Sequence, residues 1–92
     1  MSKVYAFLAD GFEEVEALAV IDVLRRANVD VTTFSVMNRF EVNGSHNIII
    51  KADKLIEEAD WSEADVLFLP GGMPGTLNLG ACSRLTDQIK QF

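Results

Sequence analysis

Three short apolar runs give the chain the pattern of a parallel sheet. They cover residues 4–9, 30–37 and 65–69, and the first and last are apolar at almost every position. Such runs are typical of strands whose two faces are both covered by helices, since a strand with one wet face alternates apolar and polar residues. The pattern therefore predicts an α/β fold with a doubly wound, mainly parallel sheet.

The segment between the first two runs predicts a helix over about residues 14–27, ending near Asn28. Glutamates at its start suit the positive end of a helix dipole. One face has apolar residues at helical spacing and should pack on the sheet. This stripe consists of Ala17, Val20, Ile21, Leu24 and Ala27.

The outer face of the same helix is also apolar, at Val15, Leu18, Ala19 and Val23. A helix that is apolar all round is normally covered on both sides. We expect a contact with a second subunit on this face, although a covering segment of the same fold would serve equally well. Asp22 and Arg26 are four residues apart and should form a surface ion pair.

Turn residues punctuate the rest of the chain. Residues 40–51 predict a hairpin at a sheet edge, with its turn at Asn43 and Gly44, because Asn-Gly is the strongest short hairpin signal. Residues 54–59 predict a short helix or turn, and residues 84–92 a last helix without a stop signal. Only three core parallel strands result, whereas a doubly wound domain usually has about five. The far edge of the sheet should therefore be open, and we expect residues 1–92, without an internal boundary, to be a truncated domain or one that a partner chain completes.

Composition narrows the class of partner. The 92 residues are 49% hydrophobic, enough for one small core, and their formal net charge is −6. A protein that tracks phosphates needs a surplus of Lys and Arg, so nucleic acids and anionic membranes are not expected as partners. No apolar run approaches the roughly 20 residues of a membrane span, and the N-terminus lacks a signal-peptide pattern, so we expect a cytoplasmic location.

Cys82 is the one cysteine and His46 the one histidine. A single thiol excludes an internal disulfide, and neither residue has the sequence neighbours of a zinc site, so no metal or cofactor is expected. The segment before Cys82 is not the sharp strand-to-helix elbow that exposes a nucleophile. We interpret Cys82 as an ordinary thiol and His46 as structural or solvated.

A glycine-rich loop after the third apolar run could carry chemistry. It contains Gly71, Gly72 and Gly75. At the carboxyl end of a buried strand, glycines let backbone N–H groups converge as an oxyanion hole. A tight strand-to-helix loop would use the same glycines for backbone freedom alone, and spacing does not separate the two interpretations. The loop fits neither the Walker pattern nor GxGxxG, so the sequence gives only weak support for phosphate binding.

The acidic opening of the first helix, at Glu13, Glu14 and Glu16, is the second candidate. The structural interpretation is favoured, because carboxylates at a helix N-terminus are stabilising by about 0.3–1 kcal/mol each. A functional one rests on position, since the loops after the first and third strands open at the same sheet edge. Glu16 could then hold a thiol or a carbonyl oxygen, and burial among like charges would favour a protonated carboxyl that donates a hydrogen bond.

Taken together, residues 10–17 (DGFEEVEA), 21–27 (IDVLRRA) and 65–72 (DVLFLPGG), with Gly75, resemble the ThiJ/PfpI superfamily. The likeness is strongest to its Parkinson-associated deglycase branch, as the N-terminal half only, and it covers all 92 residues. The combination of G-x-E-E-x-E and L-P-G-G at this separation is more specific than either motif alone. The resemblance implies a flavodoxin-like sandwich, usually a homodimer, whose nucleophilic cysteine lies on an elbow just beyond Phe92.

The resemblance also implies roles for individual residues. Glu16 matches the glutamate that contacts the reactive thiol, and Gly72, with Gly71 beside it, matches the oxyanion amides. Asp22 and Arg26 fall on the helix that such dimers pack together, which also carries Val15 and Leu18. The implied substrates are reactive carbonyls, such as glyoxals and early glycation adducts, and chaperone and oxidative-stress roles are claimed for various members.

The chain differs from the family pattern because the elbow cysteine and the family's histidine are absent from these residues. Activity therefore requires the remaining C-terminal half, attached covalently or supplied as a second chain. Three other interpretations stay open. The first is a class I glutamine amidotransferase-like domain, which has a similar fold and oxyanion loop. The second is a non-enzymatic redox sensor or chaperone in which a cysteine is oxidised, and the third is a non-catalytic remnant.

Overall fold

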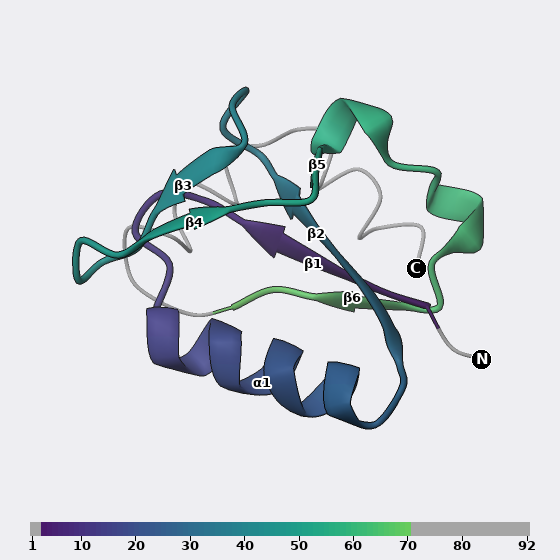
Figure 1. Ribbon diagram of the computed structural model, residues 1–92. Coiled ribbons are helices and arrows are strands. Elements are labelled where there is room, and N and C mark those ends of the chain that lie inside the picture. Colours follow the sequence, from purple (N-terminus) through teal and green to yellow (C-terminus); the bar gives the residue numbers. More distant parts are fainter. Residues whose placement is uncertain (1–2, 71–92) are drawn as a thin grey trace.

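The computed structural model describes residues 3–70 and confirms the α/β class with a mainly parallel sheet (Figure 1). Four parallel strands pair in the order β5-β2-β1-β6. Their bounds are Lys3–Leu8 for β1, Asp30–Ser35 for β2, Lys54–Leu55 for β5 and Val66–Phe68 for β6. The glycine-rich loop, Cys82 and the expected last helix lie outside the described residues.

The interpretation of residues 54–59 as a helix or turn was partly wrong. They begin with β5, which pairs with Phe34 and Ser35 of β2, and only then turn into η1 (Ile56–Glu58), which is followed by η2 (Trp61–Glu63). A strand of two residues is too short to produce a periodic pattern, so the sequence could not indicate it. The described sheet accordingly has four parallel strands and not three.

The helix α1 (Glu14–Arg26) packs on one face of the sheet, as the apolar stripe predicts (Figure 1). Ala17 and Ile21 are buried, whereas Ala27 at the end of the stripe is exposed. Ile21 belongs to a core cluster with Val4, Ala6 and Val31 of the neighbouring strands. Asn28 adopts the left-handed conformation, with a φ of 62°, and this ends the helix where the sequence predicts.

The other face of the sheet carries an aromatic cluster. The Tyr5 and Phe34 rings have centroids 4.6 Å apart, and the Phe7 ring stacks on Trp61 of η2 at 5.3 Å. Residues of β1 therefore alternate between the two faces, and both faces are apolar. This is the reason why the first run reads as continuously hydrophobic.

The strand β6 is less buried than its sequence predicts. Val66 is 49% exposed, and Leu69 just after the strand is 40% exposed. Within residues 3–70, β6 pairs with β1 alone, so one of its edges has no neighbouring strand in this part of the chain.

None of the helices within residues 3–70 is long and apolar enough to cross a bilayer.

A separate antiparallel hairpin is formed by β3 (Glu41–Asn43) and β4 (Ile49–Lys51). The hairpin was predicted, but its turn is not at Asn43 and Gly44, because Asn43 still pairs with Ile49 and residues 44–48 form the connection. Asp10 anchors its base by accepting the Asn43 N–H at 3.0 Å and by an ion pair with Arg39. The hairpin is thereby held beside the connection between β1 and α1.

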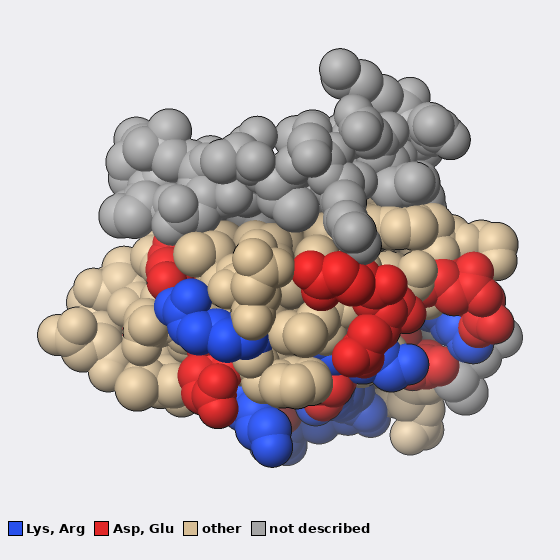
Figure 2. Space-filling model, turned by 90° about the horizontal axis from the view of Figure 1, so that it is seen from above, with Lys and Arg blue, Asp and Glu red and all other residues tan. Residues whose placement is uncertain are grey.

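Charged side chains of both signs are interspersed over the face shown in Figure 2. Ion pairs join Lys3 to Glu63, Arg25 to Asp53, Arg26 to Asp22 and Arg39 to Asp10. A surface that tracks nucleic-acid phosphates would instead gather its cations in a basic patch. Each of these four cationic side chains is instead paired with a carboxylate.

Candidate active-site edge and helix surface

The acidic opening of α1 begins with a helix cap. Glu13 is the N-cap residue, and its carboxylate accepts the N–H of Val15 at 2.8 Å. This bond satisfies one of the N–H groups that a helix start leaves without an internal partner. The structural role that the sequence favours for this segment is therefore present at Glu13.

The carboxylate of Glu14 holds the hairpin connection, residues 44–48, onto the start of α1. Its side chain is 2% exposed. The N–H groups of His46 and Ile48 donate to Oε2 at 2.7 and 3.2 Å, and the Ser45 hydroxyl donates to Oε1 at 3.3 Å. The Nδ1 atom of His46 lies 2.9 Å from the same Oε1. We refer to this set of bonds as the Glu14 clamp.

The clamp determines the ionisation of Glu14. Burial alone would raise its pKa, but the hydrogen bonds from the His46 side chain and from the backbone of His46 and Ile48 outweigh it and lower the pKa to about 2. Glu14 is therefore an anion at neutral pH, and its charge is neutralised by donors rather than by water. Such a group stabilises a contact and is poorly suited to transfer a proton near neutrality.

Gly44 lets the connection approach Glu14 closely. A Cβ atom at this position would lie 2.2 Å from both Cδ and Oε2 of Glu14, which is shorter than any real contact. The Asn-Gly pair thus serves close packing and not a two-residue turn. This explains why the strongest hairpin signal in the sequence misplaced the turn.

His46 takes part in the clamp from the solvent side. Its side chain is 68% exposed, and Nδ1 also lies 3.7 Å from a carboxylate oxygen of Glu13. The hydrogen bond to Glu14 and the negative charges of Glu14 and Glu13 raise the pKa of His46 above its ordinary value. The structural interpretation of His46 is confirmed in this sense, with partners that the sequence did not indicate.

One atom each from Glu13, Glu14 and His46 lies within 4.8 Å of the others, which is the spacing of a possible metal site. These atoms are already engaged, since Nδ1 of His46 bonds to Glu14 and the Glu14 oxygens accept the loop N–H groups. A cation at this helix N-terminus would also meet the positive end of the dipole. The hydrogen bonds account for the cluster without an ion.

Glu16 lies two residues further along the first turn and is exposed. The burial expected for Glu16 falls on Glu14 instead, because positions two apart point to different sides of a helix. The strands β1 and β6 are parallel neighbours, with Ala6 opposite Phe68, so their carboxyl ends meet at one edge. The segment carrying Glu16 and the segment leading into Gly71 and Gly72 therefore start from the same edge, while the two glycines lie outside the described residues.

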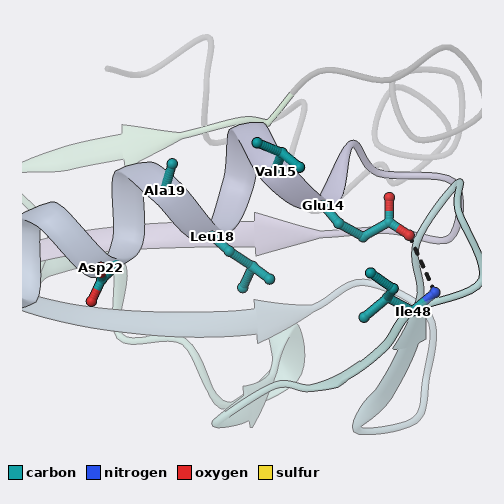
Figure 3. A pocket seen from close by; sticks show the side chains of 6 residues that line it. All are labelled: Glu14, Val15, Leu18, Ala19, Asp22 and Ile48. Atoms are coloured by element: carbon teal, nitrogen blue, oxygen red, sulfur yellow. Dashed lines mark hydrogen bonds between the residues drawn. The ribbon is translucent and has the colours of Figure 1, made fainter.

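The outer face of α1 carries an open, largely apolar groove of about 450 Å³ (Figure 3). Val15 is 75% exposed and Val23 63% exposed on this face. Most of the groove lining comes from α1, and Ile48 of the hairpin connection supplies the opposite wall. The lining residues are Glu14, Val15, Leu18, Ala19, Asp22 and Ile48. Arg26 is joined to the groove through its ion pair with Asp22 at 3.0 Å, as the spacing predicts.

The sequence model of the DJ-1/PfpI family matches residues 2–92. The chain belongs to the DJ-1/PfpI family. Curated relatives include Protein DJ-1 homolog B of Arabidopsis thaliana, which is 38% identical over 91% of this chain and 19% of the relative. The Parkinson disease protein 7 homolog of Danio rerio is 33% identical over 96% of this chain and 47% of the relative. YraA of Bacillus subtilis, named as a candidate cysteine protease, is 31% identical over 98% of this chain and 53% of the relative.

Solved DJ-1 structures share the fold. Toxoplasma gondii DJ-1 in its oxidised form has a TM-score of 0.94 at 37% identity, covering 99% of this chain and 50% of that one. Drosophila melanogaster DJ-1beta has a TM-score of 0.92 at 33% identity, covering 99% and 50%. The chain therefore spans about half the length of these DJ-1 structures, and the flavodoxin-like class expected from the resemblance is confirmed.

Sequence reasoning missed the Glu14 clamp in this DJ-1/PfpI chain. Glu14 and His46 are 32 residues apart, and no short-range spacing connects them. The available signal was weak: a glycine follows Asn43 in the predicted hairpin, and a second glutamate, Glu14, directly follows the cap residue Glu13. These segments are brought together by long-range contacts, among them the parallel bridge between Phe12 and Gly44 and the hydrogen bond from the Asn43 N–H to Asp10.

Proposed function

We propose that this chain is part of a cysteine-dependent hydrolase or deglycase-like protein that acts on reactive carbonyls, such as glyoxal or early glycation adducts. The observation that carries the proposal is the shared edge of β1 and β6, which brings the Glu16 segment and the approach to Gly71 and Gly72 together in a DJ-1/PfpI chain. The nucleophilic cysteine is placed outside residues 1–92, in the remaining C-terminal half, as the same polypeptide or as a second chain. A cytoplasmic location and the absence of a cofactor belong to the same proposal.

The chemistry assigned to this edge is nucleophilic attack on a carbonyl. The thiolate sulfur forms a bond to the carbonyl carbon, and the C=O π electrons move to oxygen. The Gly72 amide, with the Gly71 amide beside it, would stabilise the resulting oxyanion until it takes up a proton and gives a thiohemiacetal. Glu16 acts as a positioning residue that holds the sulfur by a hydrogen bond, whereas the clamped Glu14 anion is not assigned a step.

The test is a Glu16→Gln substitution in the whole protein. We expect a loss of glyoxal turnover of about 10²-fold or more, together with a change in the pH profile of thiol alkylation. Glu57→Gln, an exposed glutamate of η1, is the matched control and should leave both measurements unchanged. Full turnover and an unchanged thiol profile in Glu16→Gln would contradict the role of Glu16.

The groove on α1 supports a second part of the proposal, a homodimer that packs this face of one copy against the same face of another. An apolar helix face beside the exposed Ile48 and Ile49 is a surface that a monomer would leave in water. The proposed contact residues are Val15, Leu18, Asp22 and Arg26. Leu18→Lys should convert a dimer to a monomer in sedimentation velocity, while Glu57→Lys, a charge change on η1, should not.

A redox-sensing role is the second candidate. It is favoured by the solved oxidised form of Toxoplasma gondii DJ-1, which is 37% identical to this chain. In that role a low-pKa cysteine of the whole protein would be oxidised to a sulfinic acid, with peroxide as the oxidant and Glu16 as the hydrogen-bond partner. Peroxide titration followed by intact mass, beside a glyoxal turnover assay, separates the two functions. Stoichiometric addition of two oxygen atoms without turnover would favour the role of a redox sensor or chaperone. Turnover without oxidation would favour the enzyme.

The amidotransferase interpretation has less support, because the matching family model is that of DJ-1/PfpI and several of the relatives described above carry DJ-1 names. Intact mass spectrometry under native and then denaturing conditions would test the proposed second half directly. A covalent chain about twice as long, or a second polypeptide that separates on denaturation, is expected. A folded chain of 92 residues without either would contradict the catalytic proposal.

A further inference from the structure

The groove on the outer face of α1 has one wall that does not belong to this helix. Ile48 lies on the hairpin connection, and its backbone N–H is one of the bonds of the Glu14 clamp (Figure 3). The position of Ile48 relative to the helix therefore depends on whether residues 44–48 stay bound to Glu14. Any group that strengthens or weakens the clamp also shapes the groove.

His46 is the titratable group of the clamp. Two carboxylates of α1 face its ring, Glu14 at 2.9 Å and Glu13 at 3.7 Å, and the Ser45 hydroxyl lies 3.1 Å from Nδ1. From the connection between β1 and α1, Asp10 reaches the base of the hairpin, where it is paired with Arg39. An imidazolium thus meets two anions on the helix side and is exposed to water on the other.

We propose that His46 is a pH-responsive latch: its protonation holds residues 44–48 against Glu14, keeps Ile48 in the groove wall and so strengthens the association of two copies of the protein. This inference rests on the homodimer proposed for α1. It adds to that proposal that His46 regulates the contact and that protonation of His46 strengthens it.

The direction follows from linkage. The closed clamp raises the pKa of His46, so proton binding favours the closed state. The stabilisation is fully present below the ordinary histidine pKa of about 6.5 and is lost as the pH rises through the higher pKa of the closed state. Glu14 itself stays ionised over this range, because its pKa is about 2. Association should therefore be tighter in mildly acidic than in alkaline solution.

Sedimentation equilibrium of the whole protein at about pH 6 and about pH 8.5 tests the latch. Because the His46 side of this pair is exposed to solvent, its protonation should change the association by roughly twofold, and two latches in a dimer should raise the dissociation constant about fourfold at the higher pH. His46→Asn retains a neutral N–H donor near the position of Nδ1 and should remove this change, leaving a weak dimer at both values. His46→Arg carries a permanent charge and should give a tight dimer at both.

A His46→Asn variant with the full pH dependence of the natural protein would overturn the latch, and so would a natural dimer with no pH dependence. In both cases the groove proposal survives if Leu18→Lys still dissociates the dimer. If Leu18→Lys has no effect, the α1 surface is wrong, and the latch is overturned with it. NMR titration supplies an independent reading: the His46 ring should titrate above about pH 6.5, and Glu14→Gln should lower its midpoint. A midpoint that does not differ between the two proteins would also overturn the proposal.

Discussion

Two carboxylates each join segments that are distant in the sequence, and they do so at different depths. Glu14 is buried and collects donors from the hairpin connection. Asp53 is 47% exposed and accepts the backbone N–H and the hydroxyl of Thr33, both at 3.0 Å, together with Arg25 at 2.9 Å. The pKa of Asp53 is also lowered, since these donors outweigh its partial burial.

The two sites differ in the free-energy cost of losing their hydrogen bonds. If the hydrogen bonds at Asp53 are lost, its carboxylate can still be hydrated, because water already reaches it. If the donors to Glu14 are lost, a buried carboxylate is left without compensation, because Glu14 lies out of contact with water. A substitution that removes these hydrogen bonds should therefore lower the stability of the protein more at Glu14 than at Asp53.

The largest effect is expected from Gly44→Ala. The added methyl group would overlap the Glu14 side chain, and overpacking of this kind costs about 1–3 kcal/mol. Urea unfolding should show a correspondingly lower midpoint with an unchanged slope. An alanine variant as stable as the natural protein would mean that the clamp is looser than its geometry indicates.

The second largest effect is expected from acid, which should weaken the Glu14 clamp. Its pKa falls from an ordinary 4.5 to about 2 on folding, so its contribution is present above about pH 5 and is lost as the pH falls towards 2. Urea midpoints measured between these values should fall less steeply in Glu14→Gln than in the natural protein. Parallel curves would show that other carboxylates account for the acid sensitivity.

Asp53→Ala should have a moderate effect, of about 1 kcal/mol, because it removes the partly buried hydrogen bonds from Thr33 and the exposed one from Arg25. Thermal unfolding of this variant beside Gly44→Ala compares the two sites directly. A larger loss at Asp53 than at Gly44 would reverse the comparison.

The smallest effect is expected from Asp22→Asn, which breaks the surface ion pair with Arg26. Pairs four residues apart on a helix contribute about 0.3–0.5 kcal/mol, and salt screens them. Unfolding of the monomeric Leu18→Lys background, at low and at high salt, separates this term from any effect on subunit association. The difference between the two proteins should shrink as salt increases.

Elements that depend on their own residues could be predicted from the sequence. The continuous run of β1, the stripe of α1 and the stop at Asn28 follow from periodicity and local backbone preference, and the structure confirms them. The short strand β5 could not be predicted, because only its pairing with β2 defines it. The same limit applies to the hairpin turn, which packing against Glu14 moved beyond Asn43.

The candidate site was predictable to a smaller extent. The meeting of the β1 and β6 edges follows from parallel topology, and the Asp22 pair from helical spacing. Which glutamate is buried was not predictable, since Glu14 and Glu16 both lie in an acidic turn and only the position of the hairpin distinguishes them. The partners of His46 depend on the same long-range contact.

The close approach of Gly44 and Glu14 has a consequence for how these positions can vary. A side chain at position 44 would compete for space with the long side chain of Glu14. Replacing Gly44 while Glu14 is kept, or shortening Glu14 while Gly44 is kept, should therefore be unfavourable in a selection for folded protein. A shortened residue at 14 should relieve the constraint on 44, and the two substitutions should be less harmful together than their separate effects suggest. In a combinatorial library of both positions, surviving sequences are expected to show this epistasis, with glutamate at 14 found almost exclusively beside glycine at 44.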